Sequence, residues 1–154
     1  MPFRVTKTYG HELGLSAAFR QPAAKSHCRF IHGYALGFKL VFESDVLDEN
    51  GWVKDFGSLK PLKQRICDTF DHKMLLALDD PYLALLQDAM TFNGEPILGD
   101  IIVVPKVGCE SFAYMAGQWA NETITHDERA RGVRVVEVEC REHAGNAASY
   151  LGEY

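Results

Sequence analysis

Three side chains able to transfer protons lie within one short stretch: Cys28, His32 and Tyr34, in Cys-Arg-Phe-Ile-His-Gly-Tyr. A stabilised thiolate acts as a base or nucleophile, and an imidazole exchanges protons near neutral pH. The pair Asp71-His72 would supply and relay protons if it lay near Cys28. Spacing alone favours a plainer alternative, in which Cys28 is an ordinary buried thiol and Asp71-His72 merely ends a helix.

The composition predicts one domain with its own core. The 154 residues, 47% of them hydrophobic, are too few for two domains. The net charge of −5 and the scattered basic residues argue against nucleic acid as a partner. No signal peptide and no run of ~20 apolar residues is present, so we expect no membrane contact and a cytoplasmic location. The dispersed cysteines are expected to be free thiols: Cys28, Cys67, Cys109 and Cys140.

The first half of the chain predicts two strands and a helix. Residues 3–19 favour a strand kinked at Gly10 or Gly14, and residues 34–42 favour a second strand, together forming a long antiparallel hairpin. Asp55 is expected to cap the following helix, with Pro61 in its first turn. The apolar side chains of that helix recur at helical spacing: Leu59, Leu62, Ile66 and Phe70.

The second half predicts another helix and two more strands. Residues 110–121 form an amphipathic helix, and strands 133–141 and 147–154 are joined by a turn near Gly145-Asn146. Residues 81–87 favour a short helix, and the apolar run 101–104 is hard to place. We therefore expect an α+β domain, ordered strand-strand-helix-helix-strand-strand. Its four-stranded antiparallel sheet would carry two helices on one face.

Motifs in the first half resemble the 6-pyruvoyl tetrahydropterin synthase and 6-carboxytetrahydropterin synthase family. Cys28 followed by His32-Gly33-Tyr34 is similar to that family's Cys, short spacer and His-Gly-His. Residues 51–56, Gly-Trp-Val-Lys-Asp-Phe, resemble its Gly-x-Val-x-Asp-Phe before the first helix. Phe70-Asp71-His72 resembles the Leu-Asp-His that ends this helix in the family.

Motifs in the second half continue the same order. Glu110 resembles the Glu of the family's Pro-Thr-x-Glu, although Gly108 and Cys109 replace the Pro-Thr. Glu142, followed by Tyr150-Leu-Gly-Glu153, resembles the ending Glu…Tyr-x-Gly-Glu. Each motif is weak alone, but the shared order is specific. It implies the tunnelling fold and a single pterin-synthase-like domain over residues 1–154.

The resemblance also implies roles for particular residues. Cys28, Asp71 and His72 would be catalytic in proton transfer, while Glu142 and Glu110 would bind the substrate. A pterin ring presents a guanidine-like edge of N–H donors, and a buried carboxylate such as Glu142 accepts two of them in parallel. Without the motif, Glu142 would be interpreted as a solvated strand residue, because charged side chains usually face water.

The family's zinc site is represented here by His32 alone. Phe19 stands where the family's first zinc-binding histidine ends an Ala-Ala-His segment, and Tyr34 replaces the second His of His-Gly-His. Zinc needs about three protein ligands, so we expect weak or absent zinc binding at this position. Zinc is possible only if ligands are recruited elsewhere, from a set near in sequence or brought close by the fold: His11, His27, Cys28 and His143.

Two roles are open for Tyr34. Phe19 and Tyr34 together would fill and dry the space left by zinc, which is the role we favour. Alternatively, the phenol beside Cys28 donates a proton where the metal once stood.

The resemblance implies a homologue of lyases that convert dihydroneopterin triphosphate. One branch makes 6-pyruvoyl tetrahydropterin for biopterin, and the other makes 6-carboxytetrahydropterin for deazapurines such as queuosine. We expect a pterin-handling lyase with altered or absent zinc chemistry, acting on that triphosphate or a related dihydropterin. The alternatives are a non-catalytic pterin-binding homologue and a metal-free aldolase-type enzyme, since dihydroneopterin aldolases share the broader fold. A purely structural oligomer ranks last.

The same fold predicts self-association and an unusual insertion. Sheets of this fold leave edges that neighbouring subunits pair, so a homo-oligomer is expected, a hexamer or other closed barrel. Between His72 and Glu110 lie 37 residues, a longer connection than bacterial members usually have. We assign an extended insertion to about residues 77–107, as a lid or an interface element. Its apolar side chains favour subunit contact or core packing.

Overall fold

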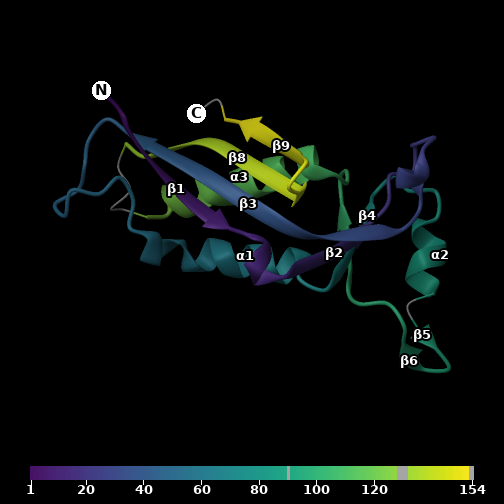
Figure 1. Cartoon of the computed structure of the whole chain (residues 1–154). Helices are drawn as coiled ribbons and strands as arrows, with labels where there is room; N and C mark the ends of the chain where they lie inside the picture. Colours follow the sequence, from purple (N-terminus) through teal and green to yellow (C-terminus); the bar gives the residue numbers. More distant parts are fainter. Residues whose placement is uncertain (90, 128–131, 153–154) are drawn as a thin grey trace.

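A long central strand, β3 (His32–Ser44), organises the sheet of the computed structural model, which describes residues 1–89, 91–127 and 132–152 (Figure 1). Strands β1 (Phe3–Tyr9) and β2 (Leu15–Phe19) pair antiparallel with successive halves of β3. They are separated by a 3-10 turn that ends at Gly14, whose φ of 64° suits a residue without a Cβ. The predicted hairpin and its kink are therefore confirmed.

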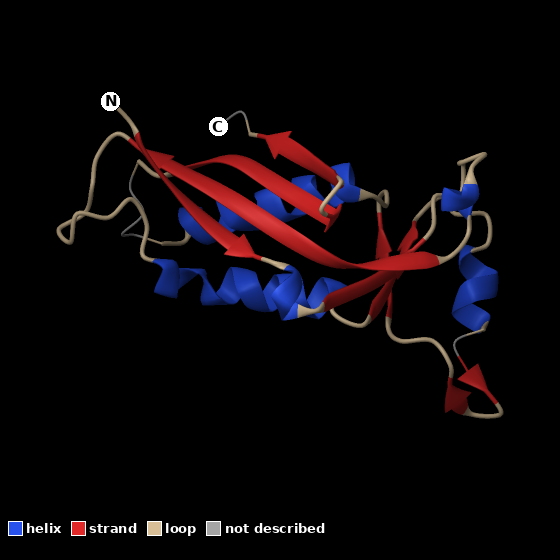
Figure 2. Ribbon diagram, in the orientation of Figure 1, coloured by secondary structure: helices blue, strands red, loops and turns tan. Residues whose placement is uncertain are grey.

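The sheet is larger than predicted. Seven strands form it, in the order β7-β4-β2-β3-β8-β9, with β1 also paired to β3 (Figure 2). The two C-terminal strands are β8 (Arg134–His143) and β9 (Asn146–Leu151), an antiparallel hairpin close to its predicted bounds.

The prediction of four antiparallel strands was wrong because the kinked first strand is two strands, β1 and β2, and because two further strands were missed. Strand β4 (Lys73–Ala77) pairs parallel with β2, and β7 (Ile101–Val104) pairs parallel with β4, so the sheet is mixed. Residues 74–77 form a continuous apolar run and are all buried, and such a strand has no polar alternation for hydrophobic periodicity to detect. Strand β7 is a run of four apolar residues at the sheet edge, too short to identify by pattern.

The described residues contain three helices: the two predicted long ones, α1 (Lys60–Phe70) and α3 (Cys109–Thr125), and α2 (Leu83–Asp88), which matches the short helix that residues 81–87 favour. Pro61 lies in the first turn of α1 as predicted. Asp55 accepts a hydrogen bond from the Gly57 N–H at 2.7 Å, but it caps a 3-10 turn (Phe56–Leu59) that leads into α1 and not α1 itself.

The core lies between α1, α3 and one face of the sheet. Phe70, on α1, contacts Phe38 on β3 with ring centroids 5.0 Å apart and Phe112 on α3 at 5.1 Å. All three side chains are fully buried or nearly so. The long helices therefore share one face of the sheet, as the sequence predicted. Among the described residues, no helix is both long and apolar enough to cross a bilayer.

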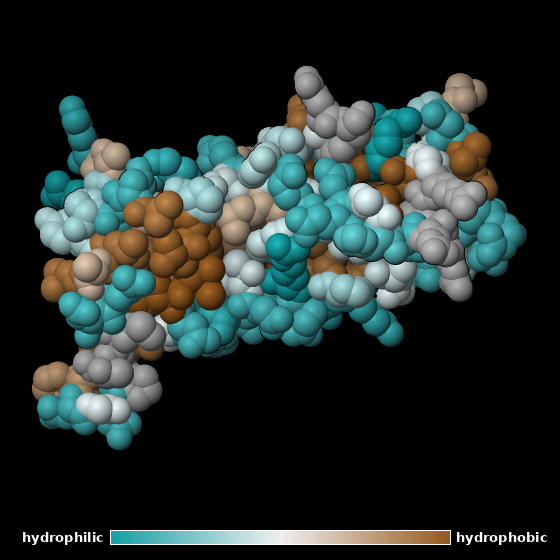
Figure 3. Space-filling model, turned by 180° about the vertical axis from the view of Figure 1, so that it is seen from behind, coloured by the Kyte–Doolittle hydropathy of each residue, from teal (hydrophilic) through white to brown (hydrophobic). Residues whose placement is uncertain are grey.

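The segment between β4 and β7 projects from the body of the domain. After α2, strands β5 (Thr91–Phe92) and β6 (Glu95–Pro96) form a hairpin whose turn residues, Asn93 and Gly94, both have positive φ. Figure 1 shows this hairpin at the far end from the N-terminus, and Figure 3 shows apolar side chains gathered at the same end. Phe92 and Ile97 are both mainly exposed there.

Candidate active site

A cavity of about 420 Å³ opens where the N-terminal ends of β3 and α3 meet the turn between β8 and β9. Four of the six predicted site residues line it: Cys28, His32, Glu110 and Glu142. The remaining lining comes from Phe19, Gln21, His27, Tyr34, Gly108, Cys109 and residues 145–148. The fold thus gathers segments that are up to 129 positions apart in the chain, from Phe19 to Ala148.

Cys28 reaches the cavity from a short 3-10 turn, His27–Arg29. Ser26 precedes this turn, and its hydroxyl accepts a hydrogen bond from the Cys28 backbone N–H at 3.4 Å. The Cys28 side chain is half-buried, so its thiol is accessible from the cavity. This placement suits a base or nucleophile and is unlike the ordinary buried thiol that spacing alone favours.

Glu142 lies at a bulge in the hairpin of β8 and β9. Arg141 pairs with Ala147 and His143 pairs with Asn146, which leaves Glu142 as the extra residue. A bulge re-aims the side chain of the inserted residue, and here Glu142 is half-buried in the cavity wall. It is therefore not a solvated strand residue.

Glu110 is held at the opposite wall by the first turn of α3. The residue before that helix, Gly108, has a φ of 112°, which favours glycine. A Cβ at Gly108 would lie 2.8 Å from the Gln21 amide nitrogen, and Gln21 itself donates a hydrogen bond to the Val107 carbonyl at 2.8 Å. These contacts fix the start of α3 at the edge of the cavity, where the Glu110 side chain remains exposed.

Phe19, His32 and Tyr34 form an aromatic cluster, and strand register explains why. Phe19 lies directly opposite His32 in the β2–β3 ladder, and Tyr34 is two residues further along the same face of β3. Ring centroids are 5.3 Å apart for Phe19 and His32, 5.5 Å for His32 and Tyr34, and 6.1 Å for Phe19 and Tyr34. The three positions that the resemblance aligns with zinc ligands therefore converge.

The side chains at these positions do not fit zinc. Phe19 has no ligand atom and is 2% exposed, with its ring packed edge-on against Phe112. Burial first, and then the charges of Glu142, Cys28 and Cys109, raise the pKa of Tyr34, which keeps the phenol protonated. Of these three side chains, only His32 offers a nitrogen suited to coordinate zinc. In the part of the chain that the structure describes, no group of three His, Cys, Asp or Glu side chains is placed to hold a metal ion.

The other two predicted catalytic residues, Asp71 and His72, lie outside the cavity. These residues follow α1, and the Asp71 carboxylate accepts a hydrogen bond from His72 Nδ1 at 2.6 Å. His72 has a φ of 54°, a strained value for a residue with a Cβ, and its side chain is 83% exposed. Within one chain the fold does not bring this pair to Cys28.

Sequence reasoning gave no cavity role to Gln21, Cys109 or Asn146, and it considered His27 only as a recruited zinc ligand. Cys109 stood inside a recognised motif but was treated only as a replacement for Thr. It lines the cavity beside the fully buried Cys140, and a hydrogen bond with Cys109, together with burial, raises the pKa of Cys140. Gln21 carried no signal, because a single polar residue in a predicted loop has no periodicity to interpret.

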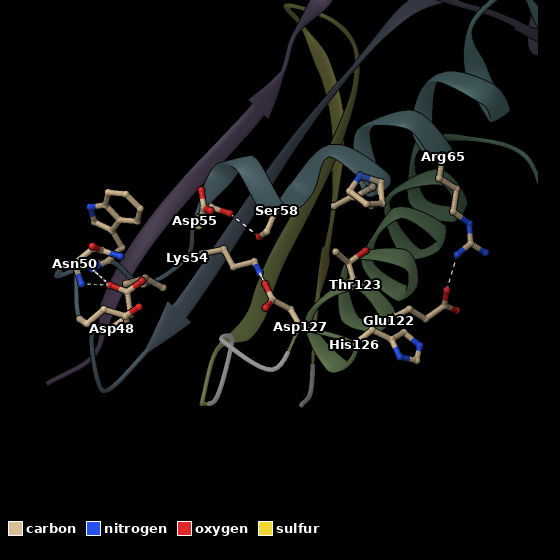
Figure 4. Close-up of a pocket in the computed structure, with 15 residues that line it drawn as sticks. Asp48, Asn50, Lys54, Asp55, Ser58, Arg65, Glu122, Thr123, His126 and Asp127 are labelled. Carbon is tan, nitrogen blue, oxygen red and sulfur yellow. Dashed lines mark hydrogen bonds and ion pairs between the residues drawn. The ribbon is translucent and has the colours of Figure 1, made fainter.

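A second cavity, of about 510 Å³, lies at the other end of α3 (Figure 4). Four of its charged side chains form two ion pairs: Lys54, 2% exposed, with Asp127, and Arg65 with Glu122. Asp48 accepts hydrogen bonds from the backbone N–H groups of Asn50 and Trp52. None of the predicted site residues lines this cavity.

Comparison with protein families gives one match that spans most of the chain. The family model described as 6-pyruvoyl tetrahydropterin synthase matches residues 10–153. The chain is 23% identical to a 6-carboxy-5,6,7,8-tetrahydropterin synthase of Aquifex aeolicus over a 164-residue alignment, which covers 99% of this chain and all of that protein. A protein of the same description from Rickettsia typhi is 32% identical over 69 residues, 44% of this chain and 50% of its own length.

Solved structures show the same fold. An uncharacterized protein from Wolinella succinogenes superposes with a TM-score of 0.75 at 21% identity, covering 99% of both chains. The 6-pyruvoyl tetrahydropterin synthase of Plasmodium vivax superposes with a TM-score of 0.68 at 16% identity, covering 97% of both chains.

Proposed function

Because this chain belongs to the 6-pyruvoyl tetrahydropterin synthase family, we propose that it is a pterin-handling lyase that works without zinc at the family's metal position. Its substrate would be dihydroneopterin triphosphate or a related dihydropterin. A cytoplasmic location, a closed homo-oligomer and a place in biopterin or queuosine biosynthesis belong to the same proposal.

One observation carries this proposal: Glu142 and Cys28 line the same cavity, which has the size of a small-molecule site. A carboxylate turned inward by a bulge is suited to accept two parallel hydrogen bonds from the N–H edge of a pterin. The pterin's side chain would then extend toward Cys28. Glu110, on the opposite wall, would accept a further hydrogen bond from the ring.

The proton transfers are assigned to Cys28, Asp71 and His72. The Cys28 thiolate would remove a proton from a side-chain carbon of the bound dihydropterin. Asp71 holds the His72 ring through its Nδ1–H, which leaves Nε2 free to exchange a proton. Because both side chains are partly or largely exposed and lie outside this cavity, we assign them to the cavity of a neighbouring copy. Closing the open sheet edges by oligomerisation would permit this.

The test is triphosphate release from dihydroneopterin triphosphate, with added zinc and with a chelator. Release that the chelator does not reduce is expected, and Cys28→Ser should lower the rate about 10³-fold, the order of effect of losing a central acid–base group. Cys67→Ser is the matched control, because Cys67 lies on α1 away from the cavity, and it should leave the rate unchanged. Release abolished by the chelator would refute metal-free chemistry.

A non-catalytic pterin-binding homologue is the second candidate. The position of Asp71 and His72 outside the cavity favours it if no second copy supplies them. A non-catalytic homologue would bind pterin to saturation and release no triphosphate. An aldolase-type enzyme would instead cleave a carbon–carbon bond of unphosphorylated dihydroneopterin, which product analysis separates from both.

A further inference from the structure

The Tyr34 hydroxyl is a hydrogen-bond donor without an acceptor. Its side chain lines the cavity and is half-buried, and among the described residues no hydrogen bond is made by its oxygen. Phe19, in contrast, is almost fully buried and packs on Phe112. Phe19 therefore fills the space between the strands and α3, and Tyr34 contributes a polar group to the cavity.

The Tyr34 ring lies between two imidazole rings, and its phenol carries its proton at neutral pH, as an ordinary phenol does. His32 and His143 flank the ring, with centroids 5.5 Å and 5.9 Å away. At neutral pH the hydroxyl is thus a donor that needs an oxygen or nitrogen acceptor from a ligand.

The His32 ring is held by a backbone hydrogen bond that does not involve the Tyr34 hydroxyl. The Phe30 carbonyl can only accept, so His32 Nδ1, 2.7 Å away, must donate to it. The neutral ring then has its lone pair on Nε2. His32 packs edge-on to Tyr34 with an interplanar angle of 89°, a contact between rings that uses no hydroxyl hydrogen.

We propose that Tyr34 recognises the substituent of the bound pterin, by donating a hydrogen bond to a hydroxyl or carbonyl oxygen on its first side-chain carbon. Glu142 holds the N–H edge of the ring, and Tyr34 selects an oxygenated side chain at the other edge. The inference rests on the proposed pterin site and adds to it the residue that distinguishes a pterin with an oxygen on its first side-chain carbon from one without it.

The test compares two pterins that differ by one oxygen, 6-hydroxymethylpterin and 6-methylpterin, in fluorescence titrations. Tyr34→Phe keeps the ring and removes the hydroxyl. It should weaken binding of the hydroxymethyl compound about tenfold, the effect expected for one neutral hydrogen bond, and change binding of the methyl compound less than about twofold. Tyr114→Phe, an exposed position outside the cavity, is the matched control and should change neither.

Each other outcome has one meaning. Equal weakening of both pterins by Tyr34→Phe, or no change for either, would overturn the role of the hydroxyl while leaving the pterin site intact. If neither pterin binds to the wild-type protein, the proposed pterin site fails and the inference falls with it. A thermal unfolding scan of Tyr34→Phe ensures that the variant compared is folded.

Discussion

The cavity at the start of α3 and the cavity at its end differ most in how their polar groups are satisfied. The second is the larger, about 510 Å³ against about 420 Å³. Four of its charged side chains, however, form ion pairs: Lys54 with Asp127 and Arg65 with Glu122. In the smaller cavity, two carboxylates, two thiols and a phenol face a common space, and no lysine or arginine is among the described residues that line it. Size therefore does not mark the site, whereas carboxylates without an ion-pair partner among the described residues do.

The largest effect is expected where a buried charge loses its partner. Asp127→Asn leaves the Lys54 ammonium, 2% exposed, without its ion pair, and should lower the free energy of unfolding by about 3 kcal/mol. Urea denaturation measures this. The control is Asp79→Asn in the exposed pair with Lys106, where a much smaller change is expected because solvent screens both charges. Pterin affinity altered by Asp127→Asn in folded protein would show that the second cavity is not merely structural.

A smaller effect is expected from Glu142, measured as pterin affinity. Glu142→Gln replaces a charged acceptor by an amide and should weaken 6-hydroxymethylpterin about 30-fold, or about 2 kcal/mol. Glu122→Gln makes the same exchange in the other cavity and should change the affinity less than about twofold. If the two substitutions weakened binding equally, the contrast between the cavities would be wrong.

The smallest effect concerns the glycine between His32 and Tyr34. A Cβ at Gly33 would lie 2.5 Å from the Ala17 carbonyl oxygen, so Gly33→Ala must push β2 away from β3. We expect a loss of about 1.5 kcal/mol in the free energy of unfolding, the usual range for overpacking. Gly37→Ala, on the same strand, meets its nearest atoms at 3.7 Å and should be tolerated. Equal costs would mean that the close approach at Gly33 is not a constraint.

Much of the fold could be predicted from the sequence, but not all of it. Alternating apolar residues predicted β3, and helical spacing predicted α1 and α3. The resemblance placed Phe19, His32 and Tyr34 at the family's three zinc-ligand positions before the structure showed that they converge. Strand β4 was missed because a buried strand lacks alternation. Strand β7 is partly exposed at the sheet edge, and its placement depends on pairing with a strand that ends 24 residues earlier, from Ala77 to Ile101.

The site was predicted less completely than the fold. Motifs placed Cys28, Glu110 and Glu142, because each belongs to a segment that the family shares. They could not show that Asp71 and His72 lie outside the cavity of their own chain, since this depends on three-dimensional packing and on assembly. The catalytic assignments to these residues remain predictions. Glu153, which completes the C-terminal motif, lies outside the described residues.

The bulge at Glu142 ties a cavity-lining carboxylate to the length of the last hairpin. Glu142 is the single residue between Arg141 and His143, and it is the extra residue of the bulge. Side chains on a strand alternate between faces, so a deletion that restored a regular ladder at this point would remove the bulge and with it the placement of the carboxylate in the cavity wall. We therefore expect single-residue deletions in this hairpin to be tolerated less well than substitutions at its exposed positions.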